Sequence, residues 1–394
     1  MHEEREPALA AEPSAIDGGP LFRLLLRLGL VVPKPSRVVL RALLTVSITW
    51  LPLLVFSLFE RGDSGQLAAH SLLRDVGTLA RFLVTLPLLI FAEVPVDSRL
   101  RSVVRQFHAS RLVPEAAEAG WNAALAKLTR RVAAWWIEVA ALVIVVLIAW
   151  RNVVPGSLDV VGWGLDSASA RGLTPAGWWF TVVSRPVFQF VVLRWLWRLI
   201  VWALFLRDTS RLELRLISTH PDCVAGLGFV GLGQGAFATV AFALASGAAG
   251  LLANRVLYGH ETLAAIRGTM IGFVVLLLLF ILAPLIAFTP RLARLRWQGQ
   301  FRHGALAARY ASDFDTKWAG DSPPASEPLL GTADIQSLAD IQNSFEPVAK
   351  LRTLPIDFTT LRVLALAAAV PFLPVLCLEI PLKDLVKKVL ALMM

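Results

Sequence analysis

The chain has 394 residues, of which 56% are hydrophobic and only 17% are charged, and its mean hydropathy is +0.64. Soluble domains carry about 25% charged residues, so this composition excludes an ordinary soluble protein. The formal net charge of +9 does not indicate a nucleic-acid-binding protein, because the arginines flank apolar runs as they do at the cytoplasmic ends of membrane helices.

The two cysteines, Cys223 and Cys377, lie far apart in the sequence. Two such residues predict neither a disulfide framework nor a zinc site, and no cofactor is expected. Residues 1–19 are polar and acidic without an apolar centre, so no cleavable signal peptide is predicted.

Apolar runs of about 20 residues, the length that crosses the hydrocarbon core of a bilayer, recur along the chain. Lipid offers no water to the backbone amides, so each run is expected to form a helix that bonds internally. The predicted fold class is therefore all-α, a polytopic transmembrane helix bundle with a small helical cytoplasmic loop region. Six helices are predicted at 42–59, 76–96, 132–150, 178–206, 229–253 and 268–288, and a seventh, which contains two prolines, at 361–380.

Four regions follow from this pattern. An N-terminal tail and an interfacial helix occupy residues 1–36 and precede the six-helix bundle at 37–289. A cytoplasmic helical loop at 290–353 contains two helical patterns, and we expect it to cap the helix ends because about 60 residues are few for an independent domain. The last membrane segment and an amphipathic C-terminal helix occupy 354–394.

Lysine and arginine are frequent before the first predicted span and after the second, fourth and sixth, and they are sparse in the alternate loops. This asymmetry predicts a cytoplasmic N-terminus. If the seventh segment crosses the bilayer, the C-terminus lies outside. A re-entrant segment bent at Pro371 and Pro374 is the alternative.

Charged and polar residues inside apolar spans are functional candidates, because burying a charge in lipid costs a few kcal/mol or more. One interpretation is a polar path that binds or passes a small anion, with two arginines toward the outer end and two carboxylates toward the inner end. The alternative is structural pairing of Glu138 with Arg194 or Arg198, and of Glu93 with a neighbouring arginine. The candidate residues are Arg81, Glu93, Glu138, Arg185, Gln189 and Arg194.

The turn at His220 and Asp222 precedes a glycine run with the spacing of a dinucleotide fingerprint. The following 25 residues contain no acidic residue and read as membrane helix, so a dinucleotide site is rejected. Asp222 or Thr219 is expected to cap the next helix. A catalytic or metal-binding role for His220 and Asp222 is the minor alternative, and no catalytic or metal-ligand set is predicted.

Glycines in the fifth predicted helix indicate close packing, because a residue without a side chain lets two membrane helices approach each other. The glycines expected at such contacts are Gly231, Gly235, Gly247 and Gly250.

The segments THPDCVAGLGF and LLGTADIQSLADIQNSFEPV resemble segments of functionally uncharacterised bacterial multi-pass inner-membrane proteins. The resemblance runs from about the first span to the C-terminus. It implies a multi-pass protein of the bacterial inner membrane, and it implies no activity, substrate or site.

Three functions are compatible with these features. The first is a channel or transporter-like protein that passes or binds a small anion or an anionic group. The second is a membrane-embedded enzyme acting on a lipid or prenyl phosphate. The third is a scaffold or sensor with a protein partner at 290–353. The expected partners are the lipid bilayer and further copies of the chain in a homo-oligomer, and no nucleic acid.

Overall fold

The computed structural model describes residues 18–27, 35–60, 68–153, 172–259, 261–319 and 333–378, together with Ser14, Gly29, Trp163 and Gly164. The described residues form helices and no strands. Seven helical stretches are long and apolar enough to cross a membrane. The chain is therefore a multi-pass integral membrane protein, and the predicted fold class is confirmed.

The first four spans match the predicted order. The first is α3 (Pro35–Thr49) and α4 (Leu51–Phe59), preceded by α2 (Gly19–Arg27). The second is α6 (Val76–Leu79), η1 (Ala80–Thr85) and α7 (Leu86–Phe91), with α5 (Ala68–Arg74) before it and α8 (Glu93–Ala109) after it. The third is α10 (Trp135–Val153), which follows η2 (Glu115–Ala117) and α9 (Glu118–Val132). The fourth is α11 (Pro175–Trp179), η3 (Phe180–Ser184) and α12 (Arg185–Ser210).

The last three spans complete the bundle. The fifth is α13 (Gly228–Gln234), η4 (Gly235–Phe237) and α14 (Ala238–Leu257), and the sixth is α15 (Leu263–Leu282) and η5 (Ala283–Phe288). A hairpin of α16 (Thr289–Phe314), η6 (Asp315–Ala319) and α17 (Ala333–Ala349) follows. The seventh span is α18 (Phe358–Ala369), η7 (Val370–Phe372) and α19 (Leu373–Leu376).

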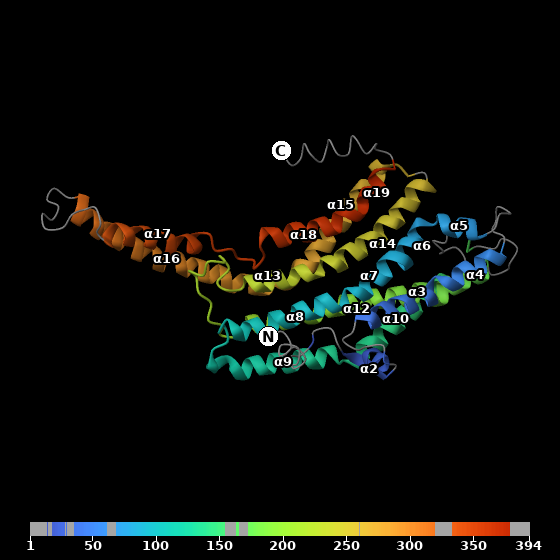
Figure 1. Cartoon of the computed structure of the whole chain (residues 1–394), viewed down its shortest axis with the longest axis horizontal. Helices are drawn as coiled ribbons and strands as arrows, with labels where there is room; N and C mark the ends of the chain where they lie inside the picture. The colour runs from blue at the N-terminus through green and yellow to red at the C-terminus, as the bar shows by residue number, and fades with distance from the viewer. Residues whose placement is uncertain are drawn as a thin grey trace.

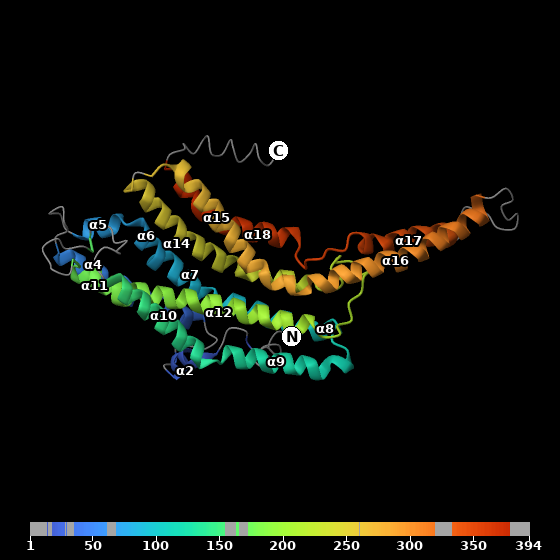
Figure 2. The ribbon, with the colours of Figure 1, turned by 180° about the vertical axis from the view of Figure 1, so that it is seen from behind.

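Figures 1 and 2 show one end of the bundle carrying α8, α9 and the α16–α17 hairpin, and we call it the basic end. The opposite end carries α4 and α5. The seventh segment runs beside α14 from the basic end to the opposite end as one 19-residue helical stretch. It therefore crosses the bundle fully instead of turning back at its prolines. The predicted C-terminal amphipathic helix lies outside the described residues.

Two π-helical turns interrupt the spans. Both η1 and η3 lie directly before a turn that contains a proline, Pro87 in α7 and Pro186 in α12. A proline lacks an amide proton and its ring clashes with the carbonyl four residues earlier, so the preceding turn widens. Such turns occur frequently at functional sites. Arg81 lies within η1, and Arg185 is the first residue after η3.

The glycines of the fifth span lie at close helix contacts. A Cβ at Gly250 would lie 2.5 Å from the Cβ of Ala80 and 2.9 Å from the carbonyl oxygen of Val76, and one at Gly247 would lie 2.9 Å from the hydroxyl of Thr85. Gly231 packs against the backbone of Pro355, and a Cβ at Gly235 would lie 3.1 Å from the Thr360 methyl group. These contacts bring α14 close to α6 and η1, and join α13 and η4 to the chain that enters α18.

The α16–α17 hairpin differs from the expected cap. Figures 1 and 2 both show it extending away from the bundle, with α16 and α17 packed along each other. At its base Gly299 lies against Ser218 and Val348, where a Cβ would come within 3.1 Å of each. At its tip the Tyr310 hydroxyl donates to the carbonyl of Asp334 at 3.2 Å. Between the two helices Leu338, Ile341 and Phe345 are half-buried, so α16 and α17 pack on each other and not on the helix ends of the bundle.

Candidate functional site

Five charged side chains meet where α3, α8 and α10 begin and α12 passes them. Glu93, the first residue of α8, is bound by two arginines from other spans. Arg198 Nη2 donates to Glu93 Oε1 at 2.8 Å, and Arg41 Nη2 donates to Glu93 Oε2. The side chains are only 7–14% exposed. An ion cluster this well buried needs such pairing to offset the loss of hydration.

The second carboxylate of the cluster, Glu138, forms a longer ion pair with Arg194. Arg194 Nε lies 3.7 Å from Glu138 Oε1, and both side chains are about 15% exposed or less. This separation is beyond a normal hydrogen bond. Among the described residues Arg194 has no hydrogen bond, although a guanidinium carries five donors. We call Arg41, Glu93, Glu138, Arg194 and Arg198 the arginine cluster.

The helix register of α12 explains the geometry. Arg194 and Arg198 are four residues apart and therefore lie on the same face of α12. The Arg198 guanidinium also lies over the Trp195 ring, 4.9 Å from its centroid. The Trp195 indole in turn donates to the carbonyl of Leu89 at 3.0 Å. These contacts join α12 to α7 and direct the arginine face toward α10.

A groove of about 750 Å³ begins at the arginine cluster and extends along the apolar part of the bundle. Its walls come from α3, α10, η3 and α12, and α2 contributes Pro20 and Leu25 at the cluster end. Wall residues such as Leu44, Leu142 and Val182 are exposed, so the groove opens sideways on the surface of the bundle. We call it the lateral groove. Its walls are largely aliphatic, and the charges that line it belong to the arginine cluster.

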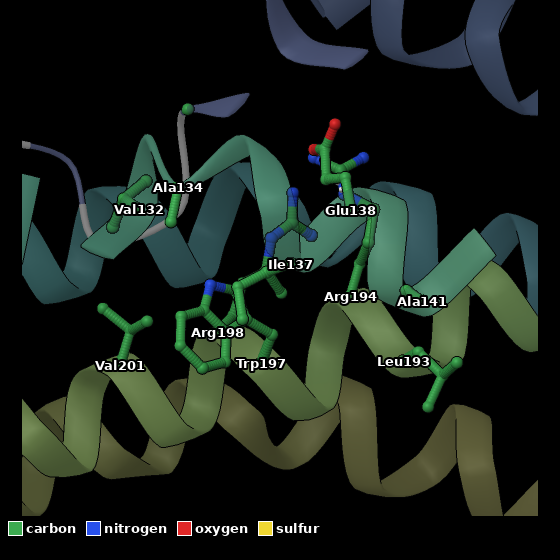
Figure 3. A pocket seen from close by; sticks show the side chains of 11 residues that line it. Val132, Ala134, Ile137, Glu138, Ala141, Leu193, Arg194, Trp197, Arg198 and Val201 are labelled. Carbon is green, nitrogen blue, oxygen red and sulfur yellow. Dashed lines mark ion pairs between the residues drawn. The ribbon is translucent and has the colours of Figure 1, made fainter. Parts of the chain in front are cut away.

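Figure 3 shows three members of the arginine cluster, Glu138, Arg194 and Arg198, around a small cavity of about 30 Å³ between α10 and α12. Arg194 and Arg198 extend from α12 toward the helix that carries Ile137 and Glu138. Arg194, Arg198 and Glu138 line both cavities. At this level α10 begins with Trp135 and Trp136, which are 60% and 57% exposed. Exposed tryptophans are typical of the membrane–water interface, so the cluster lies near headgroup depth.

The structure divides the predicted candidates into two groups. Glu93, Glu138 and Arg194 line the lateral groove, whereas Arg81, Arg185 and Gln189 line neither cavity. Gln189 Oε1 is buried and has no hydrogen-bond partner in the described part of the chain. The described cavities therefore do not join these residues into one polar path.

Two members of the cluster were missed as candidates. Arg41 reads in the sequence as one of several cations before the first span, and the sequence predicts Arg198 only as an alternative structural partner of Glu138. The usable signal was the count of charges, because three arginines and two carboxylates at one depth give an excess of one positive charge.

The His220–Asp222 turn lies apart from the lateral groove and caps α13. Asp222 Oδ1 accepts hydrogen bonds from the amides of Val224 and Gly226 at 2.9 and 3.1 Å, and Oδ2 accepts from the amide of Gly228 at 2.9 Å. The chain around it is strained, since Cys223 and Ala225 have φ of 54° and 60°. Non-glycine residues rarely adopt this conformation, and the three amide bonds hold them in it.

The turn is also tied to the segment that leads into α18. Arg352 donates from Nη2 to the carbonyl of Asp222 at 3.0 Å, and its backbone amide donates to the carbonyl of Cys223 at 2.8 Å. The His220 ring nitrogen Nδ1 lies 2.9 Å from Asp222 Oδ1. Both oxygens of Asp222 are thus engaged within the turn, as expected of a structural cap. Among the described residues no group of three or more metal-ligating side chains is present.

We expect replacement of Asp222 by asparagine to destabilise the protein by about 1 kcal/mol, because both carboxylate oxygens accept backbone amides and the amide nitrogen of asparagine cannot. Burial acts to raise the pKa of Asp222, but the amide hydrogen bonds outweigh it and hold the pKa below its ordinary value. The stabilisation is therefore complete above the unfolded-state pKa of about 4, and it is lost as the pH falls through the lower folded-state pKa.

Thermal unfolding in detergent between pH 3 and pH 6 measures this effect. The parent chain should lose stability toward pH 3, and Asp222→Asn should show a smaller acid-side loss. Equal pH profiles for the two chains would contradict the capping role.

Comparison with known proteins finds no match to a family model, to a curated protein or to a solved structure. This outcome agrees with the sequence resemblance, which implies no named family.

Proposed function

We propose that the protein binds a membrane amphiphile, with its anionic headgroup on the arginine cluster and its hydrocarbon chain in the lateral groove. The observation that carries the proposal is Arg194. Its buried guanidinium makes one long ion pair at the point where an apolar groove of about 750 Å³ begins. A bound phosphate or carboxylate would accept the remaining donors, and charge-assisted hydrogen bonds of this kind are strong.

Charge and shape both support this ligand class. Three guanidinium groups face two carboxylates in the cluster, which leaves one positive charge for a ligand. A small soluble anion would need a polar surrounding, whereas the groove beyond the cluster is lined by side chains such as Leu44, Val145 and Val187. A hydrocarbon chain fits these walls and a free anion does not. Within the channel or transporter-like hypothesis, we therefore favour an anionic amphiphile as the ligand over a small anion.

The depth of the arginine cluster supports a ligand in one particular leaflet of the membrane. The cluster lies level with the exposed tryptophans that begin α10, at the end of the bundle where the arginines of α8, α9 and α16 gather. By the positive-inside rule this end is cytoplasmic. We therefore place the ligand in the inner leaflet of a bacterial inner membrane, with the N-terminus of the chain cytoplasmic.

The test is retention of lipid by the purified protein. Chains purified in mild detergent are extracted with organic solvent, and the bound amphiphiles are quantified by mass spectrometry, which also separates phospholipids from prenyl phosphates. We expect about one anionic amphiphile per binding site in the parent chain and a loss of about tenfold or more in Arg194→Ala, because a charged partner of the headgroup is removed. Arg207→Ala is the matched control, since Arg207 is exposed on the same helix and lines neither cavity.

A second variant addresses the hydrocarbon end. Leu142 is exposed in the groove wall, so Leu142→Trp should fill the groove without disturbing the core or any charge. We expect Leu142→Trp to lower the amount of anionic amphiphile that the purified protein retains. Retention of the anionic amphiphile at the parent level in both Arg194→Ala and Leu142→Trp would overturn the proposal, as would equal retention of zwitterionic lipid.

A further inference from the structure

Two aromatic side chains on the projecting hairpin are open to solvent. Trp297 and Phe301 of α16 are 66% and 63% exposed, and their ring centroids lie 4.8 Å apart. A tryptophan and a phenylalanine in mutual contact form a large apolar surface. Exposed patches of this kind mark interaction sites in soluble parts of proteins.

The aromatic pair belongs to a longer stripe on the side of α16 that faces away from α17. Trp297, Phe301, Ala305 and Ala308 are all exposed and follow one another at four, four and three residues, the spacing of one helix face. The side toward α17 instead contains Gly299, Gly304 and Tyr310, which contact α17 or the chain next to it. The stripe is therefore a second face that α17 does not cover.

Positive charge accompanies the stripe: Arg294 lies on the same face one turn before Trp297, and Arg302 and Arg309 lie along one side of it. Arg294, Arg302 and Arg309 are exposed on α16, and the first acidic residue of that helix is Asp313 near its end. An apolar stripe with a basic side is complementary to a surface with an apolar row and an acidic side.

The bilayer does not suit the stripe as its partner. Trp297 and Phe301 lie 9 and 13 residues beyond Phe288, the end of η5, which is about 13 and 20 Å along a helix. The headgroup layer adds only about 5–8 Å to each side of the hydrocarbon core. The hairpin extends away from the bundle in both views, so the stripe lies beyond the membrane surface.

A second copy of the chain does not suit it either. Two α16 stripes packed together would bring Arg294, Arg302 and their counterparts into like-charge contact, which is costly. The outer face of α17 carries Gln336, Asp340 and Asn343, and Ile335 is the one exposed large hydrophobic side chain that the structure describes on this helix, which is too little to cover the aromatic rings. Its carboxylates are already engaged, Asp340 by Gln336 and Glu346 by Lys350.

We infer that this stripe docks an acidic amphipathic helix of another protein. The mode is helix-in-groove recognition, in which apolar side chains of the partner cover Trp297 and Phe301. Acidic side chains at one end of that row and along one side of it pair with Arg294, Arg302 and Arg309. The inference is independent of the lateral groove and its ligand.

The experiment uses the full chain in phosphatidylcholine nanodiscs and a fluorescein-labelled synthetic helix of 21 residues, with leucine on one face and glutamate beside it. The control peptide carries lysine in place of glutamate. Fluorescence anisotropy should show saturable binding of the acidic peptide only. Trp297→Ala with Phe301→Ala should weaken it by about tenfold or more, since buried aromatic residues dominate such interfaces.

Charge reversal provides the sharper test. The double variant Arg294→Glu with Arg302→Glu should bind the acidic peptide more weakly than the parent chain does, and it should bind the lysine peptide. Gln336→Ala with Asn343→Ala, on the exposed face of α17, is the matched control and should leave binding unchanged. All six positions are exposed, so these variants are expected to fold as the parent chain does.

Four outcomes overturn the inference. The first is that the acidic peptide does not bind, and the second is that the two peptides bind equally well. The third is that Trp297→Ala with Phe301→Ala abolishes self-association of the chain. The fourth is that the same double variant abolishes binding of the chain to phosphatidylglycerol vesicles. The third outcome would assign the stripe to a second copy and the fourth to an anionic membrane.

Discussion

Replacing Glu93 with alanine is expected to lower the free energy of unfolding by about 3–5 kcal/mol, the cost of breaking a buried ion pair from one side. The carboxylate of Glu93 binds both Arg41 and Arg198, which are 14% and 7% exposed. Its removal leaves two buried guanidinium groups without their acceptor. Glu93→Gln, which keeps the volume, should be nearly as destabilising, because the loss is of charge and not of packing.

Denaturant titration in detergent micelles measures the effect. Glu346→Ala is the control, because Glu346 pairs with Lys350 on the exposed face of α17 and such surface pairs contribute little. A double change, Glu93→Ala with Arg198→Ala, should recover part of the lost stability, since one orphaned charge is removed with its partner. If the double variant is less stable than Glu93→Ala, the ion-pair account is wrong.

Replacing Gly250 with leucine is expected to destabilise the bundle by about 3 kcal/mol, at the upper end of the usual cost of overpacking. A Cβ at this position would already lie 2.5 Å from the Cβ of Ala80 and 2.9 Å from the carbonyl oxygen of Val76. Part of what the leucine side chain would meet is the backbone of α6, and a backbone cannot rotate away as a side chain can. The helices α14 and α6 would therefore have to separate.

The matched control is Gly272→Leu in α15. Gly272 also lies within a membrane-spanning helix, but a Cβ there meets no atom within 4 Å. The two variants change the same residue type in the same way, so their difference in unfolding free energy measures the helix contact alone. Equal destabilisation by both would show that loss of glycine, and not the close approach of α14 to α6, is responsible.

The sequence alone determined where the chain enters and leaves the membrane. Helix formation in lipid depends on the local run of apolar residues, because backbone amides have no other partner there. The seven spans and the glycines of the fifth span could be read one segment at a time. The hydrogen bonds of Asp222 could also be predicted from one segment, since the amides that its carboxylate accepts lie within the next six residues.

Only the tertiary structure decided which charges meet. Glu93 lies 52 residues from Arg41 and 105 residues from Arg198 in the chain, and their contact depends on the rotation of three helices about their axes. That rotation is set by side-chain packing and by the proline-linked π-turns, which shift the helix register. The lateral groove and the outward direction of the α16–α17 hairpin have the same origin, because each is a relation between helices that no single segment encodes.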